Sequence, residues 1–241
     1  MIVVITQTYG AGRKELYDIR SKDEMLKYFI SSFDHDIYSF HNSDIETINY
    51  YKSCNFNREY LEFNGVSYTE TIKLMITHLK NIGCTKLIFL QDDVFSYNQD
   101  IKDIDILINE IKNNKITMLN IEMCLTDFNN SVRDNLILSK SIGGIEIWKA
   151  FTSNFVQNGN YSFDDGPFVI DFELINVIFD QNFFKIGDVW AAENYNNDKF
   201  KNIDFPRYIT NKIFFKRYNI VGRNNWDRNN ELERLKKNFL K

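Results

Sequence analysis

The chain has 241 residues, of which 44% are hydrophobic, and a formal net charge of -4 at neutral pH. A chain of this length can bury a sizeable core, and its acidic balance argues against nucleic acid bound through a general basic field. The 3 cysteines lie far apart without a CxxC pair, which argues against a disulfide framework or zinc site and fits a reducing, cytoplasmic compartment. No apolar run approaches the length of a membrane span.

The first predicted strand, residues 2–5, is an apolar β-branched run typical of a strand buried on both faces. It leads into a glycine-containing loop, residues 6–13, where Tyr9 can stack on a base and Arg13 can meet a phosphate. The loop is neither a Walker A sequence nor a full GxGxxG, so an ordinary strand-to-helix turn remains the alternative. A helix is predicted next, over residues 14–33.

Residues 36–40 form the second predicted strand, which ends in a polar segment that includes Asp44. A capping role at the start of the following helix is the structural alternative for Asp44. The next stretch, residues 47–63, is polar and aromatic and predicts a helix and a loop.

The clearest signal in the chain is a helix followed by a strand with an acidic end. Apolar residues at helical spacing predict a helix over residues 69–82, and residues 87–90 predict a buried strand that ends in Gln91, Asp92 and Asp93. Ligands of open α/β sheets bind beyond the carboxyl ends of the strands, where two carboxylates suit a hard divalent cation. A solvated loop or a helix cap is the alternative for the two carboxylates.

Helix and strand continue to alternate, with a predicted helix over residues 101–111 and a strand over residues 116–121. This alternation predicts an α/β fold with a three-layer, mostly parallel central sheet flanked by helices. The second half is mixed: residues 142–148 suit a strand bent by glycines.

Two adjacent carboxylates in the second half, Asp164 and Asp165, precede a predicted helix over residues 169–179. Pro167 fits the first helical position, and Asp165 near the amino end favours the helix dipole, so capping alone explains it. Asp171 lies further into the same predicted helix, where a solvated face is the alternative.

The last part of the chain predicts a late strand over residues 183–190 and a polar loop over residues 194–201. Residues 207–228 are rich in basic and aromatic side chains. The tail, residues 231–241, is a short basic amphipathic helix that we expect to dock on the domain, with contact to a membrane surface as the alternative.

The order of these pieces resembles a glycosyltransferase of the GT-A fold, the class that depends on nucleotide-sugars. The first strand with its loop is similar to the start of that family's nucleotide-binding half. Residues 40–44 are similar to its acidic, serine-bearing loop, without the usual leading Asp. Residues 90–94 resemble its metal-binding D-x-D segment, with Gln91 in place of the first acidic residue. Residues 164–165 resemble the Glu-Asp pair that supplies the base in inverting members, and the similarity extends to about residue 190.

The resemblance implies one GT-A-like domain, residues 1–241, with three parts. These are a nucleotide-binding half (1–121), an acceptor half (122–205) and a basic C-terminal extension (206–241). It implies transfer of a sugar from a nucleoside diphosphate sugar to a hydroxyl of a glycan or other acceptor. It also implies a divalent cation, Mn²⁺ or Mg²⁺, as cofactor.

The resemblance also assigns the site residues. Asp93 and Asp92 are the implied metal ligands, and Asp165 is the implied base, with Asp164 and Asp171 as further catalytic candidates. The implied nucleotide pocket consists of Thr6, Tyr9, Arg13, Asp44, Gln91 and Asp92.

Two departures from the family pattern bear on the metal. Gln91 carries no charge, and all 3 histidines precede the acidic segment, so Asp188, Glu193 or water would complete the metal's ligands. A nucleotidyltransferase of related fold, and a non-catalytic module that binds nucleotide or carbohydrate, remain the alternative functions.

Overall fold

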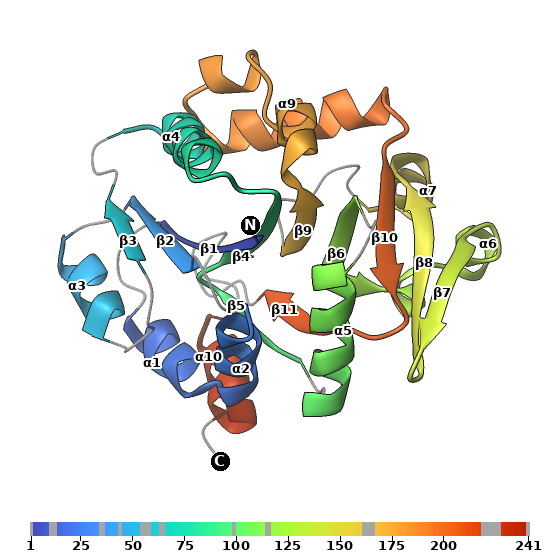
Figure 1. The fold of residues 1–241 in the computed structure, drawn as a ribbon, viewed down its shortest axis with the longest axis horizontal. Coiled ribbons are helices and arrows are strands. Elements are labelled where there is room, and N and C mark those ends of the chain that lie inside the picture. The colour runs from blue at the N-terminus through green and yellow to red at the C-terminus, as the bar shows by residue number, and fades with distance from the viewer. Residues whose placement is uncertain are drawn as a thin grey trace.

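A nine-stranded sheet runs through the centre of the computed structural model (Figure 1). The structure describes residues 2–9, 14–33, 37–42, 45–53, 59–62, 66–97, 100–113, 117–160, 167–217 and 228–239. In spatial order the strands of the large sheet are β3 (Glu59–Glu62), β2 (Ile37–Asn42), β1 (Ile2–Tyr9), β4 (Lys86–Gln91), β9 (Phe168–Asp171), β6 (Met118–Cys124), β10 (Pro206–Thr210), β8 (Ile145–Phe151) and β7 (Ile137–Ile142). A separate two-stranded sheet consists of β5 (Val94–Ser96) and β11 (Phe215–Arg217).

The two halves of the large sheet differ in strand direction. Strands β3, β2, β1 and β4 pair in parallel and form the first half. In the second half β6 and β10 pair in parallel, whereas β8 and β9 run against them. Strand β9 lies between β4 and β6 and is antiparallel to both. The predicted α/β fold with a central sheet between helices and a mixed second half is confirmed, and the parallel pairing is found in the first half and between β6 and β10.

Helices cover both faces of the large sheet and give the three expected layers (Figure 1). The α-helices are α1 (Lys14–Lys22), α2 (Glu24–Ser31), α3 (Ile45–Ser53), α4 (Tyr68–Asn81), α5 (Ile101–Asn113), α6 (Asn130–Arg133), α7 (Thr152–Gln157), α8 (Ile175–Ile178), α9 (Val189–Lys201) and α10 (Arg228–Phe239). The short 3₁₀ helices are η1 (Leu125–Asp127), η2 (Phe172–Leu174) and η3 (Phe183–Lys185). Helices α4 and α9 pack on one face, and α2 and α5 pack on the other.

Strand β4 joins the two layers of the core. Leu87 and Phe89 pack with α4 and α9, whereas Ile88 and Leu90 pack with α2 and α5. Successive side chains of a strand point to opposite faces, so a continuous apolar run is buried on both. All four side chains are at most 2% exposed, and burial of each contributes roughly 1.5–3 kcal/mol.

Most predicted elements of the first half are confirmed within a few residues. They are the strands at residues 2–5, 36–40, 87–90 and 116–121 and the helices at residues 69–82 and 101–111, which correspond to β1, β2, β4, β6, α4 and α5. The stretch at residues 47–63 contains the predicted helix, as α3, but it also contains strand β3, which the sequence pattern did not predict.

The single helix predicted over residues 14–33 is wrong, because α1 and α2 are separated at Asp23. The Asp23 carboxylate caps α2 by accepting a hydrogen bond from the Leu26 N–H. It also accepts hydrogen bonds from the backbone N–H and the hydroxyl of Ser96 in β5. Asp23 is 2% exposed, and a buried carboxylate needs such partners. Apolar spacing continues across the break, so it did not reveal the cap.

The glycines at residues 143–144 form a hairpin turn and do not bend one strand, as the sequence pattern had suggested. Gly143 and Gly144 have φ values of 57° and 83° and connect β7 to β8. Two consecutive positive φ angles match the right-handed twist of a two-residue hairpin, and glycine adopts them at little cost.

The helix predicted over residues 169–179 is also wrong at its start. Residues Phe168 to Asp171 form β9, and helical structure begins only with η2 and α8. Pro167 therefore precedes a strand and is not the first residue of a helix. A short apolar run buried on both faces has no alternation to distinguish it from a helix.

The late strand predicted over residues 183–190 and the polar loop over residues 194–201 are replaced by η3 and α9. Asp188 caps α9, because its Oδ1 accepts a hydrogen bond from the Ala191 N–H at 2.9 Å. Only a few positions of α9 are buried, among them Ala192 and Phe200, so its apolar periodicity is weak.

The terminal helix α10 docks on the domain as predicted. Its Leu235 is fully buried and packs with Leu16, Tyr17 and Ile19 of α1 and with Phe95 of β5. Within the described parts of the chain, no helix is both long and apolar enough to cross a bilayer.

We predict that Leu235→Ala lowers the free energy of unfolding by about 2–5 kcal/mol, the usual cost of removing a buried leucine side chain. Lys237→Ala changes an exposed residue of the same helix and should shift this free energy by less than about 0.5 kcal/mol. Urea unfolding of both variants provides the measurement. Equal, small effects would show that α10 is not docked in solution.

Candidate functional site

Gln91, Asp92 and Asp93, here called the acidic turn, connect β4 to β5 at the carboxyl end of β4. Thr6 of β1 is level with Leu90, and β1 extends to Tyr9, level with Asn42 of β2. The carboxyl ends of three parallel strands therefore meet at the same edge as the acidic turn. This is the edge at which open α/β sheets bind ligands.

Two side chains of helix α1 form hydrogen bonds with the acidic turn. The Tyr17 hydroxyl donates a hydrogen bond to Oδ2 of Asp92 at 2.9 Å, and Nη1 of Arg20 donates to the Gln91 carbonyl oxygen at 2.6 Å. Both side chains are 0% exposed. Residues three apart on a helix lie on one face, so one helix fixes two positions of the turn.

Arg20 carries a positive charge directly behind the acidic turn. In the described parts of the chain, its Nε and Nη2 atoms are buried without a hydrogen-bond partner. An incompletely bonded buried cation costs free energy, which nearby negative charge offsets. The carboxylates of the turn supply negative charge close to this guanidinium.

The two carboxylates of the turn differ in environment. Asp92 is 3% exposed and bonded to α1, whereas Asp93 is half-buried. The described residues contain no group of three or more His, Cys, Asp or Glu side chains arranged for a metal ion. Mg²⁺ is commonly held by one or two carboxylates together with substrate phosphates and water, so Asp93 with Asp92 suits a cation bound in that way.

An ion pair lies next to the acidic turn. Arg217 of β11 lies opposite Val94, the residue directly after Asp93. Its backbone N–H donates to Oε1 of Glu122 in β6 at 3.1 Å, and its Nη2 lies 3.7 Å from Oε2 of Glu122. The sequence pattern does not mark Glu122 and Arg217, because only strand pairing brings them near the turn.

The candidate base is not described by the structure. Asp164 and Asp165 lie outside the described residues, as do Arg13 and Asp44 of the predicted nucleotide pocket. The chain resumes at Pro167, whose carbonyl oxygen accepts a hydrogen bond from the Ile121 N–H. Phe168 then pairs with Phe89 of β4, toward the carboxyl end of that strand.

The third catalytic candidate, Asp171, is not brought to the acidic turn. It pairs with Lys86 at the opposite end of β4 and forms an ion pair with the Lys86 ammonium. Five residues of strand separate Lys86 from Gln91, which is roughly 16 Å. The separation follows from β9 being an antiparallel strand and not the start of a helix. Of the two further metal candidates, Asp188 caps α9 and Glu193 lies within it.

Comparison with known proteins gives no match to a family and no match to a curated protein. Among solved structures, a nucleotidyl transferase from Methanothermobacter thermautotroptrophicus is similar over 100% of this chain and 98% of that one, at 8% identity and a TM-score of 0.49. TarS from S. aureus is similar over 99% of this chain and 42% of that one, at 11% identity and a TM-score of 0.47. A UDP-glucose pyrophosphorylase complexed with UDP-glucose is similar over 100% of this chain and 99% of that one, at 9% identity and a TM-score of 0.45.

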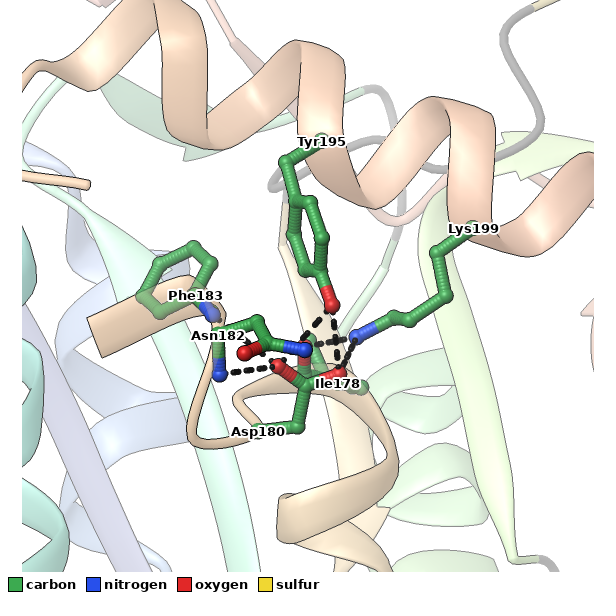
Figure 2. Close-up of polar contacts among 6 residues, drawn as sticks. All are labelled: Ile178, Asp180, Asn182, Phe183, Tyr195 and Lys199. Atoms are coloured by element: carbon green, nitrogen blue, oxygen red, sulfur yellow. Dashed lines mark hydrogen bonds and ion pairs between the residues drawn. The ribbon is translucent and has the colours of Figure 1, made fainter. Parts of the chain in front are cut away.

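A separate polar cluster joins the loop after α8 to α9 (Figure 2). The Asp180 carboxylate accepts hydrogen bonds from the backbone N–H groups of Asn182 and Phe183 and from the Tyr195 hydroxyl. The Lys199 ammonium lies 3.3 Å from Oδ2 of Asp180 and donates to the Ile178 carbonyl oxygen at 2.6 Å. These contacts fix the loop against the helix.

The cluster shifts the pKa of each of its titrating groups. Burial raises the pKa of Asp180, but the Phe183 N–H, the Tyr195 hydroxyl and the Lys199 charge outweigh it, and the pKa falls below its usual value. Burial, and then the Asp180 carboxylate, raise the pKa of Tyr195. Burial lowers the pKa of Lys199, although Asp180 opposes this change.

We predict that Asp180→Asn destabilises the protein at neutral pH by on the order of 1 kcal/mol, because charge-assisted hydrogen bonds are lost. A carboxyl whose pKa falls on folding stabilises above its unfolded pKa, and this contribution disappears as pH falls through the folded value. The difference from wild type in urea unfolding should therefore be smaller at an acidic pH below the usual pKa of an aspartate. Asp198→Asn, an exposed control on α9, should show little difference at either pH.

Proposed function

We propose that this protein is a glycosyltransferase that moves a sugar from a nucleoside diphosphate donor to a hydroxyl of a glycan or other acceptor. The acidic turn carries the proposal. It is fixed by α1 at the carboxyl edge of a parallel half-sheet, next to Arg217. The resemblance of residues 90–94 to a D-x-D segment supports the same function.

Asp93 is the proposed ligand of Mn²⁺ or Mg²⁺, because it is the more accessible carboxylate of the turn. When bound, the cation would neutralise the charge that grows on the diphosphate as it leaves. Asp92, held by Tyr17, orients the turn and contributes a second oxygen ligand at most. A neighbouring hydrogen-bond donor of this kind commonly fixes a ligating carboxylate.

The donor nucleotide would occupy the carboxyl ends of β1 and β2. Thr6 and Tyr9 lie in the carboxyl-terminal half of β1, and Arg13 and Asp44 follow β1 and β2 in the sequence. Tyr9 is proposed to stack on the base and Arg13 to meet a phosphate. The nucleotide-binding half, residues 1–121, would thus hold the donor, and residues 122–205 would hold the acceptor.

Asp165 is the proposed general base, with Asp164 as the alternative. The acceptor oxygen would attack the anomeric carbon as its proton moves to the Asp165 carboxylate. The bond between that carbon and the diphosphate oxygen breaks, and its electron pair leaves with the nucleoside diphosphate. Asp171 is omitted, because it lies at the other end of β4.

Product analysis tests the proposal. We expect free nucleoside diphosphate when the full chain is incubated with a panel of nucleotide-sugars, Mn²⁺ and a hydroxyl acceptor. Release of pyrophosphate from a nucleoside triphosphate and a sugar phosphate would instead identify a nucleotidyltransferase. Donor binding without any release would identify a non-catalytic module.

Asp93→Asn should lower donor affinity in Mn²⁺ at least tenfold, with an unchanged melting temperature, because the residue lies in a turn outside the core clusters. Asp92→Asn should lower the melting temperature more, since Asp92 is buried against Tyr17. Titration of donor with and without Mn²⁺ measures the first effect. Unchanged affinity of Asp93→Asn in Mn²⁺ would remove Asp93 from the metal site.

Asp165→Asn should lower kcat by about 10²–10⁴-fold and leave donor affinity unchanged, because a general base acts on the acceptor. Asp171→Asn is the matched control, which removes the same charge at the other end of β4. Asp164→Asn tests the alternative base. Turnover, donor affinity and melting temperature are measured together on the three variants. Wild-type turnover of Asp165→Asn would place the base elsewhere.

A further inference from the structure

Arg217 reaches the acidic turn through the register of the small sheet. Strand β11 runs antiparallel to β5, with Phe215 opposite Ser96 and Arg217 opposite Val94. Opposite residues of such a pair have Cα atoms about 4.5–5.5 Å apart. Because Asp93 directly precedes Val94, the register brings the backbone of Arg217 close to the acidic turn.

Glu122 holds the Arg217 residue at this place. The hydrogen bond from the Arg217 N–H to Oε1 of Glu122 ties the backbone of β11 to β6. The guanidinium itself lies 3.7 Å from Oε2, an ion pair beyond hydrogen-bond distance. Both side chains are 19% exposed, so the pair is only partly screened by water.

The negative charge of the acidic turn would repel a diphosphate unless an accessible positive charge lies nearby. Asp92, Asp93 and Glu122 place three carboxylates near this edge, and a diphosphate adds further negative charge. Of the two arginines that the described residues place near the turn, Arg20 is 0% exposed and bonded to the Gln91 carbonyl. Arg217 is the partly exposed one, and its planar fork matches phosphate oxygens.

We propose that Arg217 binds the diphosphate of the donor directly and that Glu122 is the positioning residue that presents it. The inference rests on the proposed function for the identity of the ligand. Gln91 carries no charge, and the pairing of β11 with β5 places the positive charge of Arg217 near the acidic turn. Diphosphate binding is therefore shared between the cation on Asp93 and Arg217, and part of it persists without a divalent cation.

The test uses inorganic pyrophosphate, which represents the diphosphate group that all nucleoside diphosphates share. Calorimetric titration of the full chain is performed in EDTA and again in Mg²⁺. Wild type should bind in EDTA and more tightly in Mg²⁺. Arg217→Ala should weaken binding in EDTA about 10–100-fold, since hydrogen bonds to a charged group are lost.

Lys216→Ala is the matched control. It removes the same charge from the adjacent residue, whose ammonium lies 5.3 Å from the centre of the Tyr97 ring. Neighbouring residues of a strand point to opposite faces, so pyrophosphate affinity should stay within about twofold of wild type.

Glu122→Gln tests the positioning role. It keeps an oxygen that can accept from the Arg217 N–H but removes the charge that attracts the guanidinium. Affinity in EDTA should fall severalfold, while the factor gained on adding Mg²⁺ stays as in wild type. A general loss of structure would lower both affinities and the melting temperature.

Several results would overturn the inference. Arg217→Ala could bind pyrophosphate as wild type does in EDTA, or wild type could bind only when Mg²⁺ is present. If Arg217→Ala does not fold, the same titration is made with Arg217→Lys and with the double variant Glu122→Gln, Arg217→Gln. Wild-type affinity of the double variant in EDTA would also overturn it. Pyrophosphate binding through Arg217 without nucleoside diphosphate release from any donor would refute the glycosyltransferase function alone.

Discussion

The candidate site depends on two hydrogen bonds from α1 to the acidic turn. Tyr17 fixes the Asp92 carboxylate, and Arg20 fixes the Gln91 carbonyl. Turns that follow a strand are exposed and locally mobile unless such bonds hold them. Because both donors are buried, water does not compete for them, and the position of Asp93 is determined by the core.

The antiparallel strand β9 determines which carboxylates can act together. It enters the sheet at Phe168, near the carboxyl end of β4, and leaves it at Asp171, next to Lys86. A parallel strand here would have brought Asp171 to the ligand-binding edge. The reversed direction instead gives Asp171 an ion pair with Lys86 at the far edge of the sheet. The chain enters β9 from Pro167, at the carboxyl end of β4.

Local signals predicted the parallel half of the fold and the acidic turn, because helix spacing and a four-residue apolar run are properties of neighbouring residues. Three features depend on distant contacts, which a single sequence does not display. Asp23 interrupts a continuous helical pattern, and its carboxylate bonds the distant Ser96. The apolar run of β9 is compatible with either a strand or a helix. Arg217 lies within a generally basic segment, and only its pairing with Val94 distinguishes it.

Tyr17 connects two different parts of the chain. Its ring packs with Leu235 of the terminal helix, and its hydroxyl bonds Asp92. Docking of the tail and order in the acidic turn are therefore thermodynamically linked, and the linkage acts equally in both directions. A ligand that fixes the turn should slow proteolysis and amide exchange in α10, and loss of α10 should weaken ligand binding although α10 is not part of the acidic turn.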